Sequence, residues 1–297
     1  MSCVRTVEDV TTQTELDALL PTDDDVAAYH RDGFFVSKQI IPDDVLDAAE
    51  RGMQRFYAGD VDAPFPGTTA YDDWDWSPSD GNVLRKNDYT SHMVVELGVL
   101  VRTPAIAAVA ARLSGASEIR LWHDQLLYKP PGLDGATGNV GWHTDRQYWQ
   151  SCTSEQMLTA WVPFHDCDES TGTITFVPGS HRWDLAGLNF FDQDLVALEQ
   201  RIVTPDGSAP VKVSPRIPRG AASFHHCRTV HGSGPNLSAQ PRRSMAIHLQ
   251  PGDNRHRHGL DGNGEPYYHR NDELVRSVEG EPDYSDPRIC PVLWTRH

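Results

Sequence analysis

The sequence of 297 residues is 38% hydrophobic and carries a formal net charge of −16 at pH 7. This length suits one β domain with helical additions, and the acidic balance opposes binding to nucleic acid, whose phosphates need a basic stripe. No apolar run reaches the ~18 residues of a membrane span, and the N-terminus lacks the apolar segment of a signal peptide. We therefore expect a cytoplasmic protein without a nucleic-acid or membrane partner; its oligomeric state stays open.

Residues 15–117 have the pattern of a mostly helical region. An acidic segment beginning at Thr22 can cap a helix, because its side chains accept hydrogen bonds from the first free backbone N–H groups. A glycine then ends this helix. Expected after it are a short strand at 34–36, a helix from 42 to about 58 and a helix at 99–114.

Residues 118–250 change character, because short apolar runs alternate there with turn clusters. Several short strands at such spacing predict a β-sandwich or barrel. We expect these strands at 119–122, 126–128, 158–164, 173–177, 211–213, 222–224 and 245–249, with one helix at 195–202 between them. The tail at 251–297 is polar and turn-rich, and we treat 1–297 as a single domain.

Cysteine and lysine are the residue types whose positions are informative. The five cysteines have no paired zinc-site spacing, so we expect reduced thiols; they are Cys3, Cys152, Cys167, Cys227 and Cys290. Cys227 follows two histidines, and this group is a minor candidate for a soft metal. Only four of the 26 basic residues are lysines, namely Lys38, Lys86, Lys129 and Lys212.

A His-x-Asp pair at His143 and Asp145 is the principal metal-site candidate. Along a strand these two side chains point to the same side, because side chains alternate with period two. Two histidines and one carboxylate on one face of a metal form the usual site of non-haem Fe(II) oxygenases. The pair at His30 and Asp32 has the same spacing, but it lies at a helix end before a glycine, where a solvated role is common.

The third ligand must come from a later strand, and three histidines compete for this position: His225, His226 and His231. An arginine on the neighbouring strand would suit a carboxylate co-substrate, because its planar guanidinium binds carboxylates in a bidentate manner. Arg242 and Arg243 supply candidates, and Ser244 shares a face with Arg242. A solvated hairpin end is the alternative interpretation of this basic pair.

Five ordered segments resemble the phytanoyl-CoA dioxygenase family. They are AAYHRDGFFV at 27–36, HDQLLYKPPG at 123–132, GWHTDRQYW at 141–149, LTAWVPFHDCDESTGTITFVPGSHRW at 158–183 and HGSGPNLSAQPRRSMAIHL at 231–249. The likeness covers most of residues 22–250. It implies a mainly β fold, a double-stranded β-helix (jelly roll, cupin-like) at 118–250 with N-terminal helical additions. It also implies Fe(II), 2-oxoglutarate and O2.

The resemblance assigns roles to individual residues. By position His143, Asp145 and His231 match the metal ligands, and Arg242 matches the residue that pairs with the distal carboxylate of 2-oxoglutarate. Four further positions match residues that line the co-substrate in relatives: Gln125, Trp161, Ser233 and Lys86.

The implied activity is hydroxylation of an unactivated C–H bond of a small molecule, in natural-product metabolism, with release of succinate and CO2. Related halogenases replace the carboxylate ligand by a small residue, so Asp145 argues against halogenation. No CoA-binding feature is recognisable. Desaturation, epoxidation or ring closure at the same iron site is one alternative, and a non-catalytic metal- or ligand-binding jelly roll is another.

Substrate contacts are expected from the loop at 71–90 and from the residues after the His-x-Asp pair. Three aromatic residues of the first region, Tyr71, Trp74 and Trp76, would either cover an apolar ligand or pack locally. Arg146, Gln147 and Tyr148 are the candidates from the second region.

Overall fold

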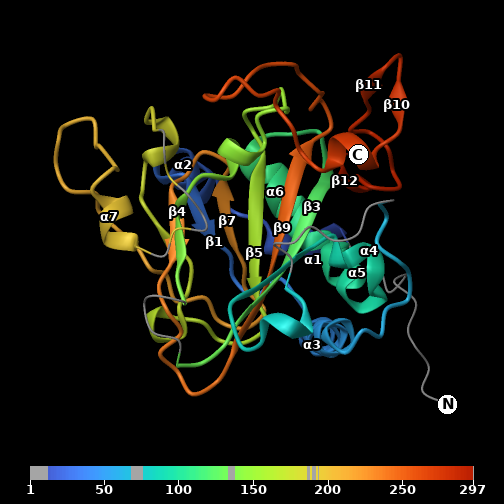
Figure 1. Ribbon diagram of the computed structural model, residues 1–297, viewed down its shortest axis with the longest axis horizontal. Helices are drawn as coiled ribbons and strands as arrows, with labels where there is room; N and C mark the ends of the chain where they lie inside the picture. Colours follow the sequence, from blue (N-terminus) through green and yellow to red (C-terminus); the bar gives the residue numbers. More distant parts are fainter. Residues whose placement is uncertain are drawn as a thin grey trace.

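The protein is built around two antiparallel sheets that face each other (Figure 1). The computed structural model describes residues 13–67, 76–132, 138–185, 188, 192 and 194–296. The larger sheet has seven strands in the order β1-β7-β5-β9-β3-β12, with β2 also paired to β3, and the smaller has the order β4-β8-β6. This arrangement confirms the predicted jelly-roll core.

The strands and helices have the following bounds. The strands are β1 (Phe34–Val36), β2 (Arg85–Asp88), β3 (Glu118–Lys129), β4 (Val140–His143), β5 (Leu158–Pro163), β6 (Thr175–Phe176), β7 (Ser223–His226), β8 (His231–Ser233), β9 (Arg242–Pro251), β10 (Ser277–Val278), β11 (Glu281–Pro282) and β12 (Val292–Thr295). The helices are α1 (Gln13–Leu19), α2 (Asp23–Asp32), α3 (Asp43–Tyr57), α4 (Thr90–Met93), α5 (Val95–Val101), α6 (Pro104–Ser114), α7 (Leu195–Glu199) and α8 (Asn271–Leu274).

Strand alternation gives the large sheet two different faces. On β5, Leu158, Ala160 and Val162 join the main hydrophobic core, whereas Thr159 and Trp161 point to the other side. The apolar face meets the helices, and the second face meets the small sheet. Polar side chains on this second face are therefore held inside the molecule, between the two sheets.

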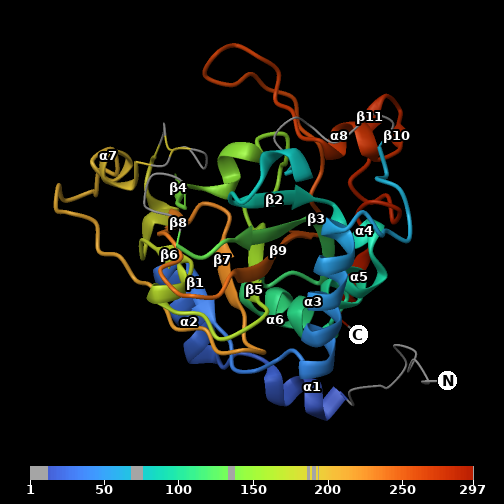
Figure 2. The same cartoon turned by 60° about the horizontal axis from the view of Figure 1, so that its bottom comes forward.

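The helices cover the outer face of the large sheet. Figure 2 shows α1, α3 and α6 on the side of this sheet opposite to β4, β6 and β8. The predicted cap of α2 is present, because Thr22 and Asp25 exchange hydrogen bonds in a capping box. The helix expected at 99–114 is divided into α5 and α6, since Pro104 starts a new helix.

The stretch Val95–Ser114, which comprises α5 and α6, is long and apolar enough to cross a membrane by composition. In the described structure 72% of this window is buried inside the protein. The apolar residues of this stretch therefore belong to the hydrophobic core beneath the large sheet.

The strands differ from the sequence expectations at several places, and β2, β8, β10, β11 and β12 were not expected. The segment at 211–213 forms no strand; Val213 makes only an isolated bridge with Phe176. The tail contributes β12, which pairs with β3 at the edge of the large sheet. A half-buried strand is recognised in a sequence by alternating apolar and polar residues. The residues of β12 are exposed or partly exposed without such alternation, so the sequence gives no sign of this strand.

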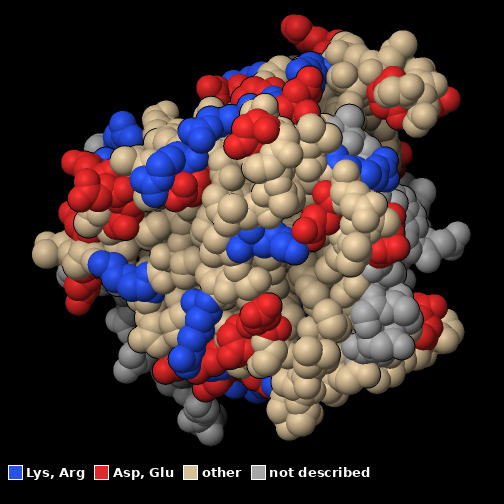
Figure 3. Space-filling model, turned by 90° about the vertical axis from the view of Figure 1, so that its left-hand side faces the viewer, with Lys and Arg blue, Asp and Glu red and all other residues tan. Residues whose placement is uncertain are grey.

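Charges of both signs are mixed on the side of the molecule that carries α7. Figure 3 shows this side, where lysine and arginine side chains lie next to acidic ones.

Candidate metal centre

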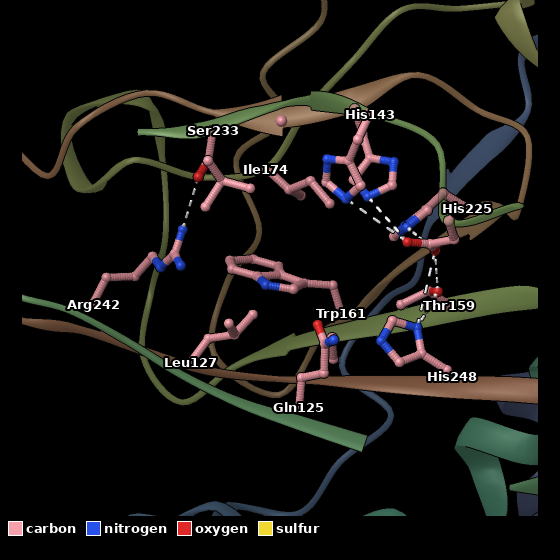
Figure 4. Close-up of a pocket in the computed structure, with 15 residues that line it drawn as sticks. Gln125, Leu127, His143, Thr159, Trp161, Ile174, His225, Ser233, Arg242 and His248 are labelled. Atoms are coloured by element: carbon pink, nitrogen blue, oxygen red, sulfur yellow. Dashed lines mark hydrogen bonds and ion pairs between the residues drawn. The ribbon is translucent and has the colours of Figure 1, made fainter. Parts of the chain in front are cut away.

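His143, Asp145 and His231 line one pocket between the two sheets, and Figure 4 labels His143 in this pocket. His143 ends β4 and is the direct ladder partner of His231 at the start of β8. The Oδ1 atom of Asp145 lies 3.8 Å from Nε2 of His143 and 3.6 Å from Nε2 of His231. All three residues are buried, and their ligand atoms lie within 4.8 Å of one another.

Asp145 does not lie on a strand, although the His-x-Asp spacing predicted a strand through both residues. It begins a short 3-10 turn, Asp145–Tyr148. Thr144 between the two residues is extended, with φ −119° and ψ 142°. The extended backbone keeps the side chains at 143 and 145 on the same side, so the expected juxtaposition still forms.

Backbone carbonyls fix the tautomers of both histidines. Nδ1 of His143 lies 2.8 Å from the carbonyl oxygen of Gly141, and Nδ1 of His231 lies 2.9 Å from that of Thr229. A carbonyl only accepts, so each Nδ1 carries the proton and donates it. Burial lowers the pKa of His143, and it lowers the pKa of His231 further. Both rings are therefore neutral, and each directs an Nε2 lone pair toward Asp145.

The carboxylate of Asp145 is held from its other side. Thr159 donates a 2.6 Å hydrogen bond to Oδ2, and Nε2 of His225 lies 3.3 Å from the same oxygen. Burial alone would raise the pKa of Asp145, but the contact with His225 at Oδ2 contributes to holding this pKa well below its usual range. Asp145 is thus an ionised carboxylate whose Oδ1 faces two imidazole lone pairs, a donor set that fits Fe(II).

His248 in turn contacts Thr159, the residue that holds Asp145. Its Nδ1 lies 2.7 Å from the Thr159 hydroxyl oxygen. Because the Thr159 proton goes to Asp145, His248 must donate to Thr159. Sequence reasoning identified neither Thr159 nor His248. Both occupy pocket-facing positions of β5 and β9, but nothing in the local sequence indicates their partners on other strands.

The structure distinguishes the three candidate histidines. His231 faces Oδ1 of Asp145 together with His143, whereas His225 lies at Oδ2 on the opposite side. His226 points away, and its ring lies 5.4 Å from that of His181. Alternation along β7 separates His225 from His226, as the sequence predicted.

The other metal-ligand candidates lie away from this pocket. Neither the pair at His30 and Asp32 nor Cys227 belongs to a ligand cluster within the described residues. Burial raises the pKa of Cys227, which disfavours the thiolate that a metal would need. A second cluster, formed by His256, His258 and Glu281, is largely exposed, and hydrogen bonds from both rings to Glu281 account for it.

Arg242 lies at the far end of the same pocket (Figure 4). Its Nη1 donates to the carbonyl oxygen of Gly172 at 2.7 Å and lies 3.4 Å from Oγ of Ser233. The guanidinium is 5.3 Å from the ring centre of Trp161, and the residue is 2% exposed. Its Nε has no hydrogen-bond partner. Burial lowers the pKa of Arg242 to about 10, so the side chain remains a cation.

Alternation on β9 also separates Arg242 from Arg243. Arg243 pairs with Glu50 on the helical side of the sheet. In the part of the chain that the structure describes, no carboxylate forms an ion pair with Arg242. A buried cation without an acidic partner is costly unless an anion joins it, and the planar fork suits a carboxylate.

The remaining predicted co-substrate residues are divided. Gln125, Trp161 and Ser233 line the pocket. Lys86 lies outside this lining on β2, and its ammonium pairs with Asp88 at 2.9 Å.

The expected substrate contacts have local roles where they can be described. Arg146 donates to three backbone carbonyls, and Gln147 donates to the carbonyl of Leu188. Tyr148 is exposed, and its ring centre lies 6.2 Å from that of His143. Trp76 packs against Arg85, whose guanidinium lies 4.1 Å from its ring centre. Tyr71 and Trp74 fall outside the described residues.

Comparison with known proteins identifies the family. A sequence model of the family described as phytanoyl-CoA dioxygenase (PhyH) matches residues 29–244. The chain belongs to the phytanoyl-CoA dioxygenase family. Mouse peroxisomal phytanoyl-CoA dioxygenase is 24% identical over 230 residues, covering 76% of this chain and 67% of the mouse protein.

A second sequence relative supports the assignment, and a solved structure supports the fold. The ectoine dioxygenase of Bordetella parapertussis is 26% identical over 237 residues, which cover 75% of this chain and 73% of that protein. Among solved structures, the non-haem α-ketoglutarate-dependent carbocyclase SnoK from nogalamycin biosynthesis has a TM-score of 0.67 at 21% identity, covering 92% of this chain and 96% of SnoK. This PhyH-family protein is thus a non-haem iron oxygenase that depends on 2-oxoglutarate and uses O2 as co-substrate.

Proposed function

We propose that this PhyH-family dioxygenase hydroxylates an unactivated C–H bond of a small molecule in natural-product metabolism, with iron on His143, Asp145 and His231. The observation that carries the proposal is one pocket that holds both halves of the required chemistry. The imidazole lone pairs and the carboxylate meet at one end. At the other end lies the buried Arg242, which forms no ion pair with a carboxylate of the described residues.

The residues of this chain orient the reactants. Gly141 and Thr229 hold the two imidazole rings through their carbonyl oxygens, and Thr159 holds Asp145. Such outer contacts set the orientation and basicity of metal ligands. Arg242 would bind the distal carboxylate of 2-oxoglutarate, with Ser233 beside it. When bound, iron with 2-oxoglutarate and O2 supplies the oxidising power for the C–H bond, with succinate and CO2 released.

The enclosure of the pocket suits this chemistry. The triad residues are at most 6% exposed, and Trp161 and Ile174 add apolar walls that exclude water. Excluding water limits side reactions of the oxidant and strengthens the charge interaction at Arg242. Asp145 occupies the ligand position that related halogenases leave to a halide, so a halogenase remains disfavoured.

A different outcome at the same site is the second candidate. The similarity to SnoK, a carbocyclase, favours ring closure as this alternative. Substrate placement decides between hydroxyl transfer and a second hydrogen abstraction, and the lining residues of the pocket are common to both. A non-catalytic binding protein is disfavoured, because a binding module has no need of an anchor for the co-substrate.

We also propose a cytoplasmic location and a small-molecule substrate that is not a CoA ester. The four cysteines that the structure describes are buried and unpaired, as expected for reduced thiols. A substrate screen tests the reaction class. Purified protein with Fe(II), 2-oxoglutarate and O2 is incubated with candidate natural products, and succinate release is measured together with product mass.

Gain of one oxygen atom in the product supports hydroxylation, and loss of two hydrogen atoms supports ring closure or desaturation. If substitutions of His143 and of His231 leave succinate formation undiminished, the chemistry takes place elsewhere and the proposal is overturned.

A further inference from the structure

Two cationic side chains lie side by side within the protein. Lys129 ends β3 and is the direct ladder partner of Arg242 at the start of β9. Lys129 is fully buried, and Arg242 is 2% exposed. Lys86 and Lys212 each pair with a carboxylate. Among the described residues, neither Lys129 nor Arg242 forms an ion pair with one.

A buried pair of like charges is unfavourable without a counter-charge. Burying an ammonium group away from water is costly unless an anion joins it. The cost shows in both groups, because burial lowers the pKa of Lys129 well below its usual range and that of Arg242 to about 10. An anion bound in the pocket at Arg242 and Ser233 would relieve both effects.

Ser233 connects the two cations and faces the pocket. Its hydroxyl oxygen accepts from Nζ of Lys129 at 2.7 Å and lies 3.4 Å from Nη1 of Arg242. With its lone pairs directed at two donors, the hydroxyl can only donate further. In the described part of the chain no acceptor receives the Ser233 proton. The proton is therefore available for a ligand in the pocket.

We infer that Lys129 is a positioning residue for the distal carboxylate of 2-oxoglutarate. By donating to Ser233 it turns the Ser233 hydroxyl proton toward the carboxylate, and it adds a second positive charge behind Arg242. This inference rests on the proposed function. It makes Lys129 a determinant of selectivity, because an oxo acid without a distal carboxylate gains nothing from either effect.

Lys129 also joins two strands, since Nζ donates to the carbonyl oxygen of Gly234 at 2.5 Å. If Lys129 only joined the two strands, its replacement would change the affinity of all ligands of the pocket equally. The selectivity between a dicarboxylate and its monocarboxylate analogue therefore separates the two roles.

The test compares two ligands that differ only at the distal end, 2-oxoglutarate and 2-oxopentanoate. Binding to protein loaded with Mn(II) is measured by calorimetry for wild type, Lys129→Met and Lys129→Gln. In Lys129→Met we expect the affinity ratio of 2-oxoglutarate to 2-oxopentanoate to fall by about 10- to 100-fold, the worth of one hydrogen bond to a charged group. Lys129→Gln, which can still donate to Ser233, should lie between this variant and wild type.

A ratio that stays at the wild-type value in both variants would overturn the role of Lys129, even if both ligands bound more weakly. A Lys129→Met protein that does not fold leaves Lys129→Gln to decide, with the unchanged ratio as the contradicting result. Failure of wild type itself to bind 2-oxoglutarate would instead contradict the proposed function, so the two failures are distinct.

The link through Ser233 is tested by a double-mutant cycle. Ser233→Ala should lower the same affinity ratio, and adding Lys129→Met to it should lower the ratio by clearly less than Lys129→Met does alone. Full additivity of the two substitutions would show that Lys129 does not act through Ser233.

Discussion

At the scale of single residues, the site depends on which buried charged groups have an oppositely charged partner and which do not. Arg242 and Arg243 are neighbours in sequence, yet Arg243 has Glu50 as a partner and Arg242 has no carboxylate among the described residues. This difference, produced by strand alternation, supports the proposal that Arg242 and not Arg243 binds the co-substrate.

Replacing Arg242 should therefore affect 2-oxoglutarate far more than iron. For Arg242→Met we expect the dissociation constant of 2-oxoglutarate to rise by about 100-fold, because a bidentate charged contact is lost. Arg243→Met is the matched control and should change this constant little. Calorimetry on metal-loaded protein provides the measurement. Equal effects of the two substitutions would contradict the anchor assignment.

The hydroxyl of Thr159 is expected to tune the metal. It donates to Asp145 and accepts from His248, so Thr159→Val removes two contacts behind the carboxylate at nearly constant volume. Loss of such outer contacts typically lowers metal affinity by about 10- to 100-fold. Competition with a chelator would measure the change, and Thr159→Ser should retain most of the affinity. An unchanged affinity in Thr159→Val would remove this residue from the account.

At the scale of elements, alternation could be predicted from the sequence but contacts between distant strands could not. The spacing of the short strands predicts a sandwich or barrel, and the family resemblance implies the jelly roll. The shared face of Arg242 and Ser244 and the separation of His225 from His226 follow from period-two alternation. The choice among His225, His226 and His231 needed the ladder that pairs β4 with β8. Thr159, His248 and Lys129 had no local signal, because their partners lie on other strands.

The turn at Gly172 contacts the site through Arg242. Gly172 has φ +70°, its carbonyl accepts from Arg242, and an added Cβ would lie 2.8 Å from the carbonyl oxygen of Gly234. Gly207 has a similar φ of +73° but open space around it. Alanine should lower the free energy of unfolding by roughly 1 kcal/mol at Gly207 and by roughly 3 kcal/mol at Gly172, where overlap adds to strain. Urea denaturation would compare them, and equal losses would contradict this account.

At the scale of the whole molecule, the jelly roll keeps many histidines neutral inside the protein. Burial lowers the pKa of His226 to about 3 and that of His269 to about 3, against an ordinary value of 6.5. Below pH 6.5 the unfolded chain binds protons that the folded protein does not take up. Stability is therefore full above pH 6.5 and is lost as the pH falls toward the folded pKa values.

The pH dependence can be assigned to one residue by substitution. Each such histidine contributes a slope of at most about 1.4 kcal/mol per pH unit below pH 6.5. His226→Asn should make the loss of stability between pH 6.5 and 4.5 shallower, whereas His30→Asn, at an exposed site, should not. Calorimetric unfolding at several pH values provides the test. Parallel curves for wild type and His226→Asn would contradict the assignment.

The central claim is that one buried centre made of His143, Asp145 and His231 holds iron next to 2-oxoglutarate. Its most direct test is the visible metal-to-ligand charge-transfer band that forms when Fe(II) and 2-oxoglutarate bind together without oxygen. We predict this band for the wild-type protein and its loss in His143→Ala, with His226→Asn as a control that retains it. A wild-type protein without the band, or an undiminished band in His143→Ala, would contradict the account.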